Sequence, residues 1–318
     1  MKILVTASTG NIGRRVLKEL MAPEFSLRVI TQHPARLPRE ICEQVEVIRG
    51  STDDPATLRQ ALEGVEALFW CVPTESLQET NVRGYYERFA RSGTQAIREA
   101  RTPRVVTISA GGKGLARNAG PLLGLRAMED ILNESGAAIR HLRCALFMEN
   151  FRRQLQPICH HGIFSYPIPG HIPIPMVAAS DIADSVLRWL VRRDWKGIEG
   201  MAVHGPEDLS YDQDAAVMER VLERPVRYKE ASANQYAQWL VESGASPDYA
   251  RGQVEMFAEL AQGFNRAEPR TAASTTTTTL FAWAESELLP LVESFRSQSG
   301  TEPGYFTPER SLSLTPWL

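Results

Sequence analysis

The opening thirteen residues limit the possible folds of this chain more than any other stretch. A short apolar run, Ile3–Val5, is followed by small residues and by two glycines, Gly10 and Gly13. Apolar residues then recur at helical spacing, with charged residues between them. This order predicts a strand, a tight turn and a helix.

The predicted turn is suited to holding a phosphate. Glycines allow a close approach, and the N–H groups at a helix N-terminus carry partial positive charge. The pattern is weaker than the usual three-glycine dinucleotide fingerprint because Ala7 stands in the first glycine position, so an ordinary buried strand and helix is the alternative. The residues expected to contact a dinucleotide are Thr6, Ser8, Thr9, Gly10, Asn11 and Ile12.

The end of the second predicted strand, Leu27–Thr31, bears on which dinucleotide binds. An acidic residue at this place often binds the ribose hydroxyls. Here the strand is followed by polar and basic residues, from Gln32 to Arg36. A basic side chain suits a 2′-phosphate better than a bare ribose. We therefore expect Gln32 and Arg36 at the cofactor, which is NADPH or NADP⁺, with NAD as the alternative.

Six apolar runs alternate with helical patterns as far as residue 142. The fourth run, 66–72, is too continuously apolar for a strand with one exposed face. The pattern predicts an α/β fold, a Rossmann-type doubly wound parallel sheet, whose ligands bind beyond the carboxyl ends of the strands. Cys71, Val72 and Pro73 follow the fourth strand, so we expect them beside the cofactor.

The pattern changes after residue 150, which predicts two parts and a tail. Residues 1–150 are expected to form the dinucleotide-binding domain and 151–296 a smaller α/β lobe that lines the substrate cleft, with the chain free to cross between the two. Residues 297–318 lack periodicity and are expected to form an extended tail. Within the lobe we expect an irregular lid over 156–175, which is rich in proline, glycine and histidine, and a strand over 201–204.

Composition excludes several classes of function. The formal net charge is −3, and 23% of the residues are charged, which predicts no basic surface for nucleic acid or an acidic membrane. No stretch approaches the ~18 uninterrupted apolar residues of a membrane span, and no basic leader precedes the first strand, so a cytoplasmic location is expected. The four cysteines lack metal-type spacing, so no metal site is expected.

Six segments together are similar to one known family. They are Val5–Gly13, Leu62–Val65, Phe147–Asn150, Ser180–Asp184, His204–Ser210 and Glu223–Tyr228. Over about residues 1–295 the chain resembles the NmrA-like proteins, an atypical branch of the short-chain dehydrogenase/reductase superfamily. The resemblance implies an NAD(P)-binding Rossmann domain, a small C-terminal lobe, and substrate between them. Some members are NADPH-dependent reductases of quinones, dyes or aromatic natural products, and others bind the dinucleotide only to sense redox state.

The chain departs from the superfamily at its proton donor. The Tyr-x-x-x-Lys pair would fall at Leu122 and Arg126. Because a tyrosine normally protonates the developing alkoxide, carbonyl reduction by that route is not expected. Hydride transfer to a quinone, an enone or an iminium needs little acid help, and there the protein mainly orients the reactants and excludes water.

Three residues are the candidate catalytic groups, each with a structural alternative. Ser109 ends the fifth strand and would hydrogen-bond a substrate oxygen or the carboxamide; otherwise it simply terminates the strand. Arg126 would bind the nicotinamide ribose or stabilise charge on the acceptor, as well as contacting the cofactor; otherwise it is a surface residue of a helix. Tyr166 would replace the missing proton donor; otherwise it is a solvated loop residue.

Four further residues are expected at the substrate: Phe147, Asn150, His160 and His161. Histidine titrates near neutrality, which suits proton transfer, although a solvated loop position is the alternative. Together the sequence predicts an NADPH-dependent reductase of a small conjugated or aromatic acceptor. The alternatives are a regulator that senses NAD(P), binds a protein partner and turns nothing over, and a non-redox cyclase or isomerase on the same fold.

Overall fold

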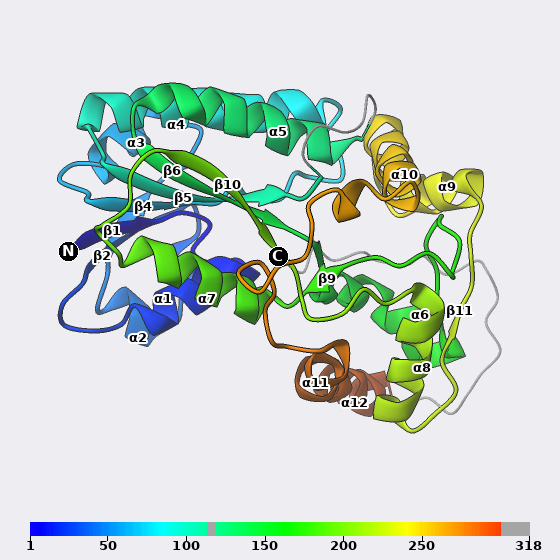
Figure 1. Ribbon diagram of the computed structural model, residues 1–318. Coiled ribbons are helices and arrows are strands. Elements are labelled where there is room, and N and C mark those ends of the chain that lie inside the picture. Colours follow the sequence, from blue (N-terminus) through cyan, green and yellow to red (C-terminus); the bar gives the residue numbers. More distant parts are fainter. Residues whose placement is uncertain (113–118, 300–318) are drawn as a thin grey trace.

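A seven-stranded parallel sheet forms the centre of the computed structural model, which describes residues 1–112 and 119–299 (Figure 1). The spatial order is β10-β6-β5-β4-β1-β2-β3, so the winding reverses between β1 and β4. This confirms the expected doubly wound fold. The strands are β1 (Lys2–Val5), β2 (Ser26–Thr31), β3 (Glu46–Arg49), β4 (Ala67–Trp70), β5 (Arg104–Ala110), β6 (Ala138–Cys144) and β10 (Ile198–Val203).

Helices cover both faces of the sheet (Figure 1). The reason is visible in β1, where Ile3 and Val5 join the core under α1 and α7, while Leu4 between them joins the core under α3 and α4. Alternate residues of a strand point to opposite faces, so a strand buried on both faces is apolar throughout. One face carries α1 (Asn11–Glu19), α2 (Arg39–Cys42) and α7 (Ala179–Leu190), and the other carries α3 (Pro55–Ala61), α4 (Val82–Ala100) and α5 (Pro121–Leu132).

A smaller lobe lies beyond the carboxyl ends of the strands (Figure 1). Its core is rich in buried aromatic side chains, among them Phe151, Phe164, Tyr211 and Trp283. Its helices are α6 (Leu155–His161), α8 (Tyr211–Leu222), α9 (Ala233–Glu242), α10 (Pro247–Ala261), α11 (Leu280–Trp283) and α12 (Leu289–Ser299), with a π-helical segment, Ala284–Leu288, between the last two. Two strand pairs complete it: β7 (Leu146–Phe147) with β9 (Met176–Val177), and β8 (Ile163–Phe164) with β11 (Arg227–Tyr228).

Two expectations about the lobe are wrong. The predicted lid over 156–175 begins with α6 and β8 instead of irregular chain. The strand expected in the lobe near 201–204 is β10, which pairs with β6 and extends the main sheet. Its edge position explains the error, because a half-exposed edge strand lacks the continuous apolar run of a central one.

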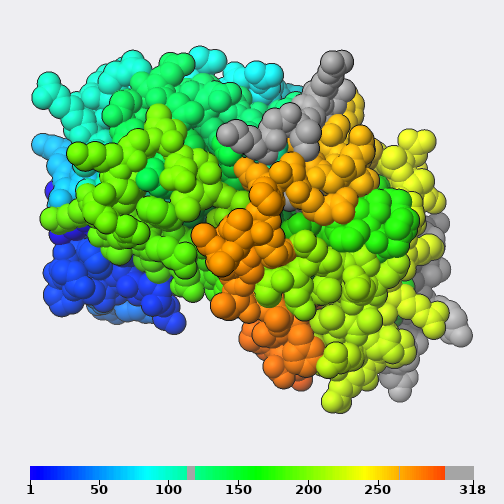
Figure 2. Space-filling view, viewed as in Figure 1, coloured from blue at the N-terminus to red at the C-terminus, as the bar shows by residue number. Residues whose placement is uncertain are grey.

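The segment between α10 and α11 returns across the junction of the two parts (Figure 2, orange). We call residues 268–279 of it the strap. The backbone N–H of His204 donates to the Ser274 carbonyl, and that of Thr276 donates to the His204 carbonyl, both over 2.8 Å. The Thr278 N–H donates to Asp181 Oδ2 on α7 over 2.9 Å. The strap therefore fastens the lobe to β10 and α7.

No helix within residues 1–112 and 119–299 is both long and apolar enough to cross a membrane. Of the tail expected at 297–318, residues 297–299 belong to α12 and the rest lie outside the described residues.

Candidate functional site

The opening turn between β1 and α1 is built for a close approach of backbone to ligand. Ala7 has φ +47°, in the left-handed region, and its carbonyl accepts the Gly10 N–H over 3.0 Å. A Cβ on Gly13 would lie 2.2 Å from that same carbonyl oxygen, so a side chain there would push α1 away from the end of β1. The turn therefore needs glycine at 13, although it tolerates alanine at 7.

The N-terminus of α1 lacks the groups that normally satisfy it. Its N-cap, Gly10, offers no capping side chain, and the first turn contains no acidic residue. Ser8 lies beside it, and its buried hydroxyl has no hydrogen-bond partner among the described residues. Unsatisfied N–H groups at a helix start, with the positive end of the helix dipole, are a ready site for a phosphate. These features fit a dinucleotide diphosphate.

Thr6 has a different role from the one expected. It is completely buried, and its hydroxyl lies 3.0 Å from the Phe69 carbonyl and 2.9 Å from the Cys71 carbonyl. It also accepts the Cys71 N–H over 2.7 Å. Thr6 therefore joins the ends of β1 and β4 and positions the turn, with its side chain directed at β4 rather than at a ligand.

Three arginines gather at the start of α1. Arg15 and Arg152 both bind the Glu287 carboxylate, over 2.7 and 2.6 Å, and Arg14 and Arg152 each donate to Asn11 Oδ1 over 3.2 Å. Partial burial and the two neighbouring arginines lower the pKa of Arg14. The charges of Glu287 and of the buried Glu149 both act on this group, so three cations face two carboxyl groups and an excess of positive charge remains, which an anion would relieve. The sequence did not indicate Arg152, because it reaches the turn from η3 (Met148–Gln154), far along the chain.

The two residues expected to select the cofactor lie together after β2. Gln32 and Arg36 are both exposed, and Arg36 belongs to the short helix η1 (Pro34–Arg36). The Arg36 guanidinium makes no ion pair with any residue of the described chain. Its charge is thus available to a phosphate on the ribose.

The loop after β4 lies beside the turn, since β4 and β1 are neighbours in the sheet. Cys71 is held there by Thr6, and the Tyr85 hydroxyl donates to the Pro73 carbonyl over 3.0 Å. Burial raises the pKa of the Cys71 thiol to about 12, so this cysteine remains a neutral thiol. Val72 lies between these two fixed points, half-buried.

Arg126 and Arg143 converge on a carboxylate that the sequence did not indicate, whereas the buried Ser109 hydroxyl has no hydrogen-bond partner among the described residues. Glu129 is buried on α5, and the Arg143 guanidinium lies 2.7 Å from it, while Arg126 lies 3.5 Å away. Burial acts to raise the pKa of Glu129, but the Arg143 hydrogen bonds and the positive charge around it outweigh burial, so the pKa is lowered. Arg126 is therefore not a solvated surface residue. Its expected contact with the nicotinamide ribose, and that of Ser109 with substrate, stay predictions.

Tyr166 lies in the lobe core and is not a solvated loop residue. It is 5% exposed, and its ring stacks on Tyr211 and Phe257 with centroids 4.9 and 5.1 Å away. Its hydroxyl donates to the Asn150 carbonyl over 3.3 Å. Burial raises the pKa of this phenol, which makes it a weaker acid than an exposed tyrosine.

His160 and His161 lie on helix α6 and are exposed, which corrects the expected lid. The His160 ring meets the Phe295 ring of α12 at 5.4 Å. Pro157 misled the prediction, because a proline in the first turn of a helix removes no helical hydrogen bond. His160 thus lies toward α12, whereas Phe147 lies in β7, directly after β6, and Asn150 in η3.

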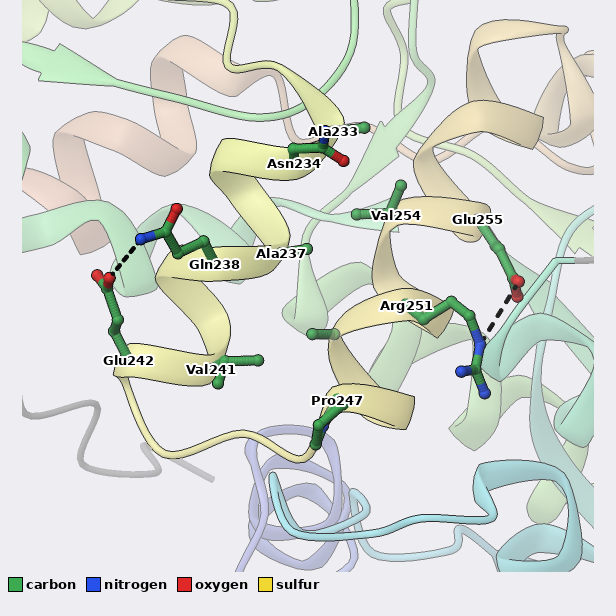
Figure 3. Close-up of a pocket in the computed structure, with 11 residues that line it drawn as sticks. Ala233, Asn234, Ala237, Gln238, Val241, Glu242, Pro247, Arg251, Val254 and Glu255 are labelled. Carbon is green, nitrogen blue, oxygen red and sulfur yellow. Dashed lines mark hydrogen bonds and ion pairs between the residues drawn. The ribbon is translucent and has the colours of Figure 1, made fainter.

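A groove between α9 and α10 lacks the uncapped helix start and the cluster of arginines found at the opening turn. Its walls include Ala237, Val241 and Val254, and its polar residues pair among themselves, as the Gln238–Glu242 bond shows (Figure 3). We therefore place the candidate site at the carboxyl edge of the sheet.

Comparison with known proteins finds similar sequences and similar folds. A family model described as NAD(P)H-binding matches residues 7–145. The chain is 27% identical over 260 residues to an NAD(P)H azoreductase of Xenophilus azovorans, covering 80% of this chain and 86% of that protein. It is 28% identical over 234 residues to a (4-alkanoyl-5-oxo-2,5-dihydrofuran-3-yl)methyl phosphate reductase of Streptomyces griseus, covering 72% and 76%.

Two solved structures share the fold. An NADPH-dependent quinone oxidoreductase of Escherichia coli has a TM-score of 0.74 and 22% identity, over 91% of this chain and 99% of that one. The negative transcriptional regulator NmrA has a TM-score of 0.69 and 16% identity, over 95% and 98%.

Proposed function

We propose that this chain, which resembles the NmrA-like proteins and matches an NAD(P)H-binding family model over residues 7–145, is an NADPH-dependent reductase of a small conjugated or aromatic acceptor. The observation that carries the proposal is the start of α1, where uncapped N–H groups, a glycine that admits close approach and an excess of arginines meet. Two of the curated relatives reduce, by their names, an azo compound and a conjugated furanone, which supports a conjugated acceptor.

Each part of the site has a role in this proposal. The backbone amides at Gly10–Ile12 hold the diphosphate, with the arginines of the turn adding charge. Arg36 binds the 2′-phosphate, which selects NADPH over NADH. Residues Cys71–Pro73 form the wall beside β4. At the far end, Ser109 and Arg126 face the nicotinamide, and the lobe covers it and excludes water.

Bound NADPH supplies the hydride. The acceptor gains that hydride and one proton, so a quinone becomes a hydroquinone and an azo bond becomes a hydrazine. Leu122, in the tyrosine position, cannot supply the proton. The proposal therefore concerns acceptors that are reduced without strong acid catalysis, and solvent provides the proton after hydride transfer.

The first experiment measures cofactor binding by calorimetry. We expect NADPH to bind more tightly than NADH, Arg36→Gln to reduce that preference by about tenfold, as expected for one lost charged hydrogen bond, and Gly13→Ala to abolish binding of both. Arg39→Gln, an exposed arginine of α2 three residues beyond Arg36, is the control. If Gly13→Ala binds NADPH as the parent does, the proposed site is wrong.

The second experiment measures turnover. Purified protein is mixed with NADPH and a panel of quinones, enones and azo dyes, and NADPH consumption is followed by absorbance. Oxidation with at least one member supports the proposal, and no oxidation across the panel contradicts it.

One observation favours a second function. With leucine at position 122, the chain lacks the proton donor of a classical reductase. A protein that only senses the redox state of the dinucleotide needs no such proton donor. Such a regulator would bind the oxidised and reduced dinucleotides with different affinities and oxidise no acceptor. The same calorimetry, run with NADP⁺ and NADPH, separates the two functions when read beside the turnover panel.

A further inference from the structure

Glu149 is a buried carboxyl group that has no part in the proposed function. It lies in η3 and is 7% exposed. Its Oε1 accepts the Ala179 N–H over 3.0 Å and the Trp283 Nε1–H over 3.2 Å, and its Oε2 lies 3.1 Å from the same Ala179 nitrogen. Ala179 is the first residue of α7, and Trp283 is the last residue of α11. One carboxyl group therefore joins three segments that are far apart in the sequence.

Charge does not explain why a glutamate stands at this position. Arg15 and Arg152 act on Glu149 only from beyond ion-pair distance, whereas both bind Glu287 directly. Burial raises the pKa of Glu149, because it disfavours the ionised carboxylate. The contribution of Glu149 is therefore its reach, since N–H groups from two different segments donate to one of its oxygens.

Arg152 lies on the same side of η3 as Glu149. In a 3₁₀-helix the side chains three residues apart are aligned, and η3 is such a helix. Arg152 donates to Asn11 Oδ1 over 3.2 Å and binds Glu287 over 2.6 Å. Trp283 and Glu287 are in turn four residues apart at the C-terminal end. Two links, from Glu149 to Trp283 and from Arg152 to Glu287, thus join the same two segments.

The bond from Glu149 to α7 also fixes η3 relative to the opening turn. Helices α7 and α1 pack against each other, with Ile182 and Val16 in one core. The Nε of Arg152 is buried and has no hydrogen-bond partner among residues 1–112 and 119–299. A guanidinium that is held beside an uncapped helix start, with one N–H unsatisfied, is placed to donate to an anion.

We propose that Glu149 is a positioning residue for the cofactor, because its hydrogen bonds to Ala179 and Trp283 hold η3 so that Arg152 meets the diphosphate at the start of α1. The inference rests on the proposed function, which assigns the cofactor to this turn. Glu149 makes no contact with the cofactor and acts through Arg152. Without Glu149, Phe151 still anchors η3 in the lobe core, but the attachment to α7 is lost.

The test uses two substitutions that separate the reach of Glu149 from its charge. Glu149→Gln keeps the oxygen that accepts both hydrogen bonds and removes the charge. Glu149→Asp keeps the charge, but its shorter side chain cannot reach both donors. In calorimetry we expect Glu149→Asp to weaken NADPH binding about tenfold, as for one lost charged hydrogen bond, and Glu149→Gln to stay within about twofold of the parent. The reverse order would show that charge matters instead of reach, and would overturn the inference.

A double-mutant cycle tests whether Glu149 acts through Arg152. In an Arg152→Gln background, Glu149→Asp should cause no further loss of NADPH affinity. An equal loss in both backgrounds would indicate a merely structural role and overturn the inference. Glu207→Asp is the matched control, because Glu207 accepts the Leu280 N–H at the first residue of α11 over 3.2 Å and does not bind η3. We expect it to keep the affinity of the parent.

The outcomes separate this inference from the proposed function. If the parent binds NADPH and Glu149→Asp binds it equally well, the inference is overturned and the proposed function stands. If the parent binds NADPH but oxidises it with no acceptor, the reductase is contradicted, and the same affinities still decide the role of Glu149. If the parent binds no dinucleotide, both are wrong.

A second variant replaces Glu149→Asp if thermal unfolding shows that this protein does not fold. Trp283→Phe keeps an aromatic ring in the core and removes the Nε1 donor, one of the two groups that Glu149 holds. We expect it to weaken NADPH binding about threefold, as for one lost hydrogen bond, and to have no effect on affinity in the Arg152→Gln background. An unchanged affinity in the parent background would overturn the inference.

Discussion

Glu129 beside the sheet and Asp214 in the lobe are both buried carboxyl groups, at 3% and 1% exposure, with opposite surroundings. Glu129 binds Arg143 over 2.7 Å, and its pKa is lowered. Neither oxygen of Asp214 has a hydrogen-bond partner among the described residues, and burial raises its pKa well above the usual value.

The difference shows how each part handles a charge that water cannot reach. Beside the sheet, Glu129 stays ionised because Arg143 forms an ion pair with it. Arg143 also binds Glu268 of the strap over 3.0 Å. The lobe keeps its acid uncharged inside an aromatic and aliphatic core. A buried charge needs a partner, and without one the group takes up a proton instead.

The largest change in stability is expected from breaking the buried ion pair between Arg143 and Glu129. Arg143→Met leaves Glu129 buried with only the more distant Arg126, at 3.5 Å, to compensate its charge, which should lower the free energy of unfolding by about 3 kcal/mol. Urea denaturation measures it. Arg192→Met, which breaks an exposed pair with Asp194, should cost less than about 1 kcal/mol. Similar losses for the two variants would mean that burial does not distinguish these pairs.

A smaller and opposite effect is expected in the lobe. Asp214→Asn replaces a carboxyl group that must hold a proton by a neutral group of similar shape. At about pH 8 this should raise the free energy of unfolding on the order of 1–2 kcal/mol, because burial disfavours the ionised carboxylate that the unfolded parent carries. A loss of stability at that pH would show that Asp214 is ionised and paired in the folded protein.

The two carboxyl groups should also differ in the sign of their pH dependence. The pKa of Asp214 is raised on folding, so its contribution is complete below its ordinary value of 3.8 and is lost as the pH rises toward the folded value. The pKa of Glu129 is lowered, so its contribution is present above 4.5 and is lost as the pH falls. Denaturation from about pH 5 to 9 should therefore show a decline that Asp214→Asn reduces and that Glu129→Gln leaves in place.

The smallest effect is spectroscopic and lies next to Glu129. Burial lowers the pKa of His141 from 6.5 to about 4, so its contribution to stability is lost as the pH falls from 6.5 toward 4. Asn133 Oδ1 at 2.8 Å from Nε2 and the Thr107 hydroxyl at 2.9 Å from Nδ1 suit a neutral ring with its proton on Nε2. In NMR spectra His141 should remain neutral at about pH 5. Titration near pH 6.5 would contradict the burial of this cluster.

The sequence predicted what depends on local pattern. Residues Ile3–Val5 are apolar because both faces of β1 are covered, and position 13 is glycine because α1 approaches Ala7 closely. The sequence therefore predicted this strand, turn and helix. The edge strand β10 and the helix α6 were misplaced, because half-exposure and an early proline hide their periodicity.

The site was predicted only where one segment builds it. The turn and Arg36 belong to continuous stretches. Arg152 and Glu129 gain their surroundings from partners more than ten residues away, so their types and spacing carried no signal. A charged residue near the end of an apolar strand, such as Arg143, was the nearest hint that a buried partner was required.

The π-helical segment before α12 has a consequence for the whole C-terminal end. It carries Glu287, the carboxylate that binds both Arg15 and Arg152. If the turn holds the cofactor as proposed, an incoming diphosphate would compete with Glu287 for those same two guanidinium groups. Nucleotide occupancy would then be linked to α11 and α12, and loosening these helices would make the entrance to the turn more electropositive.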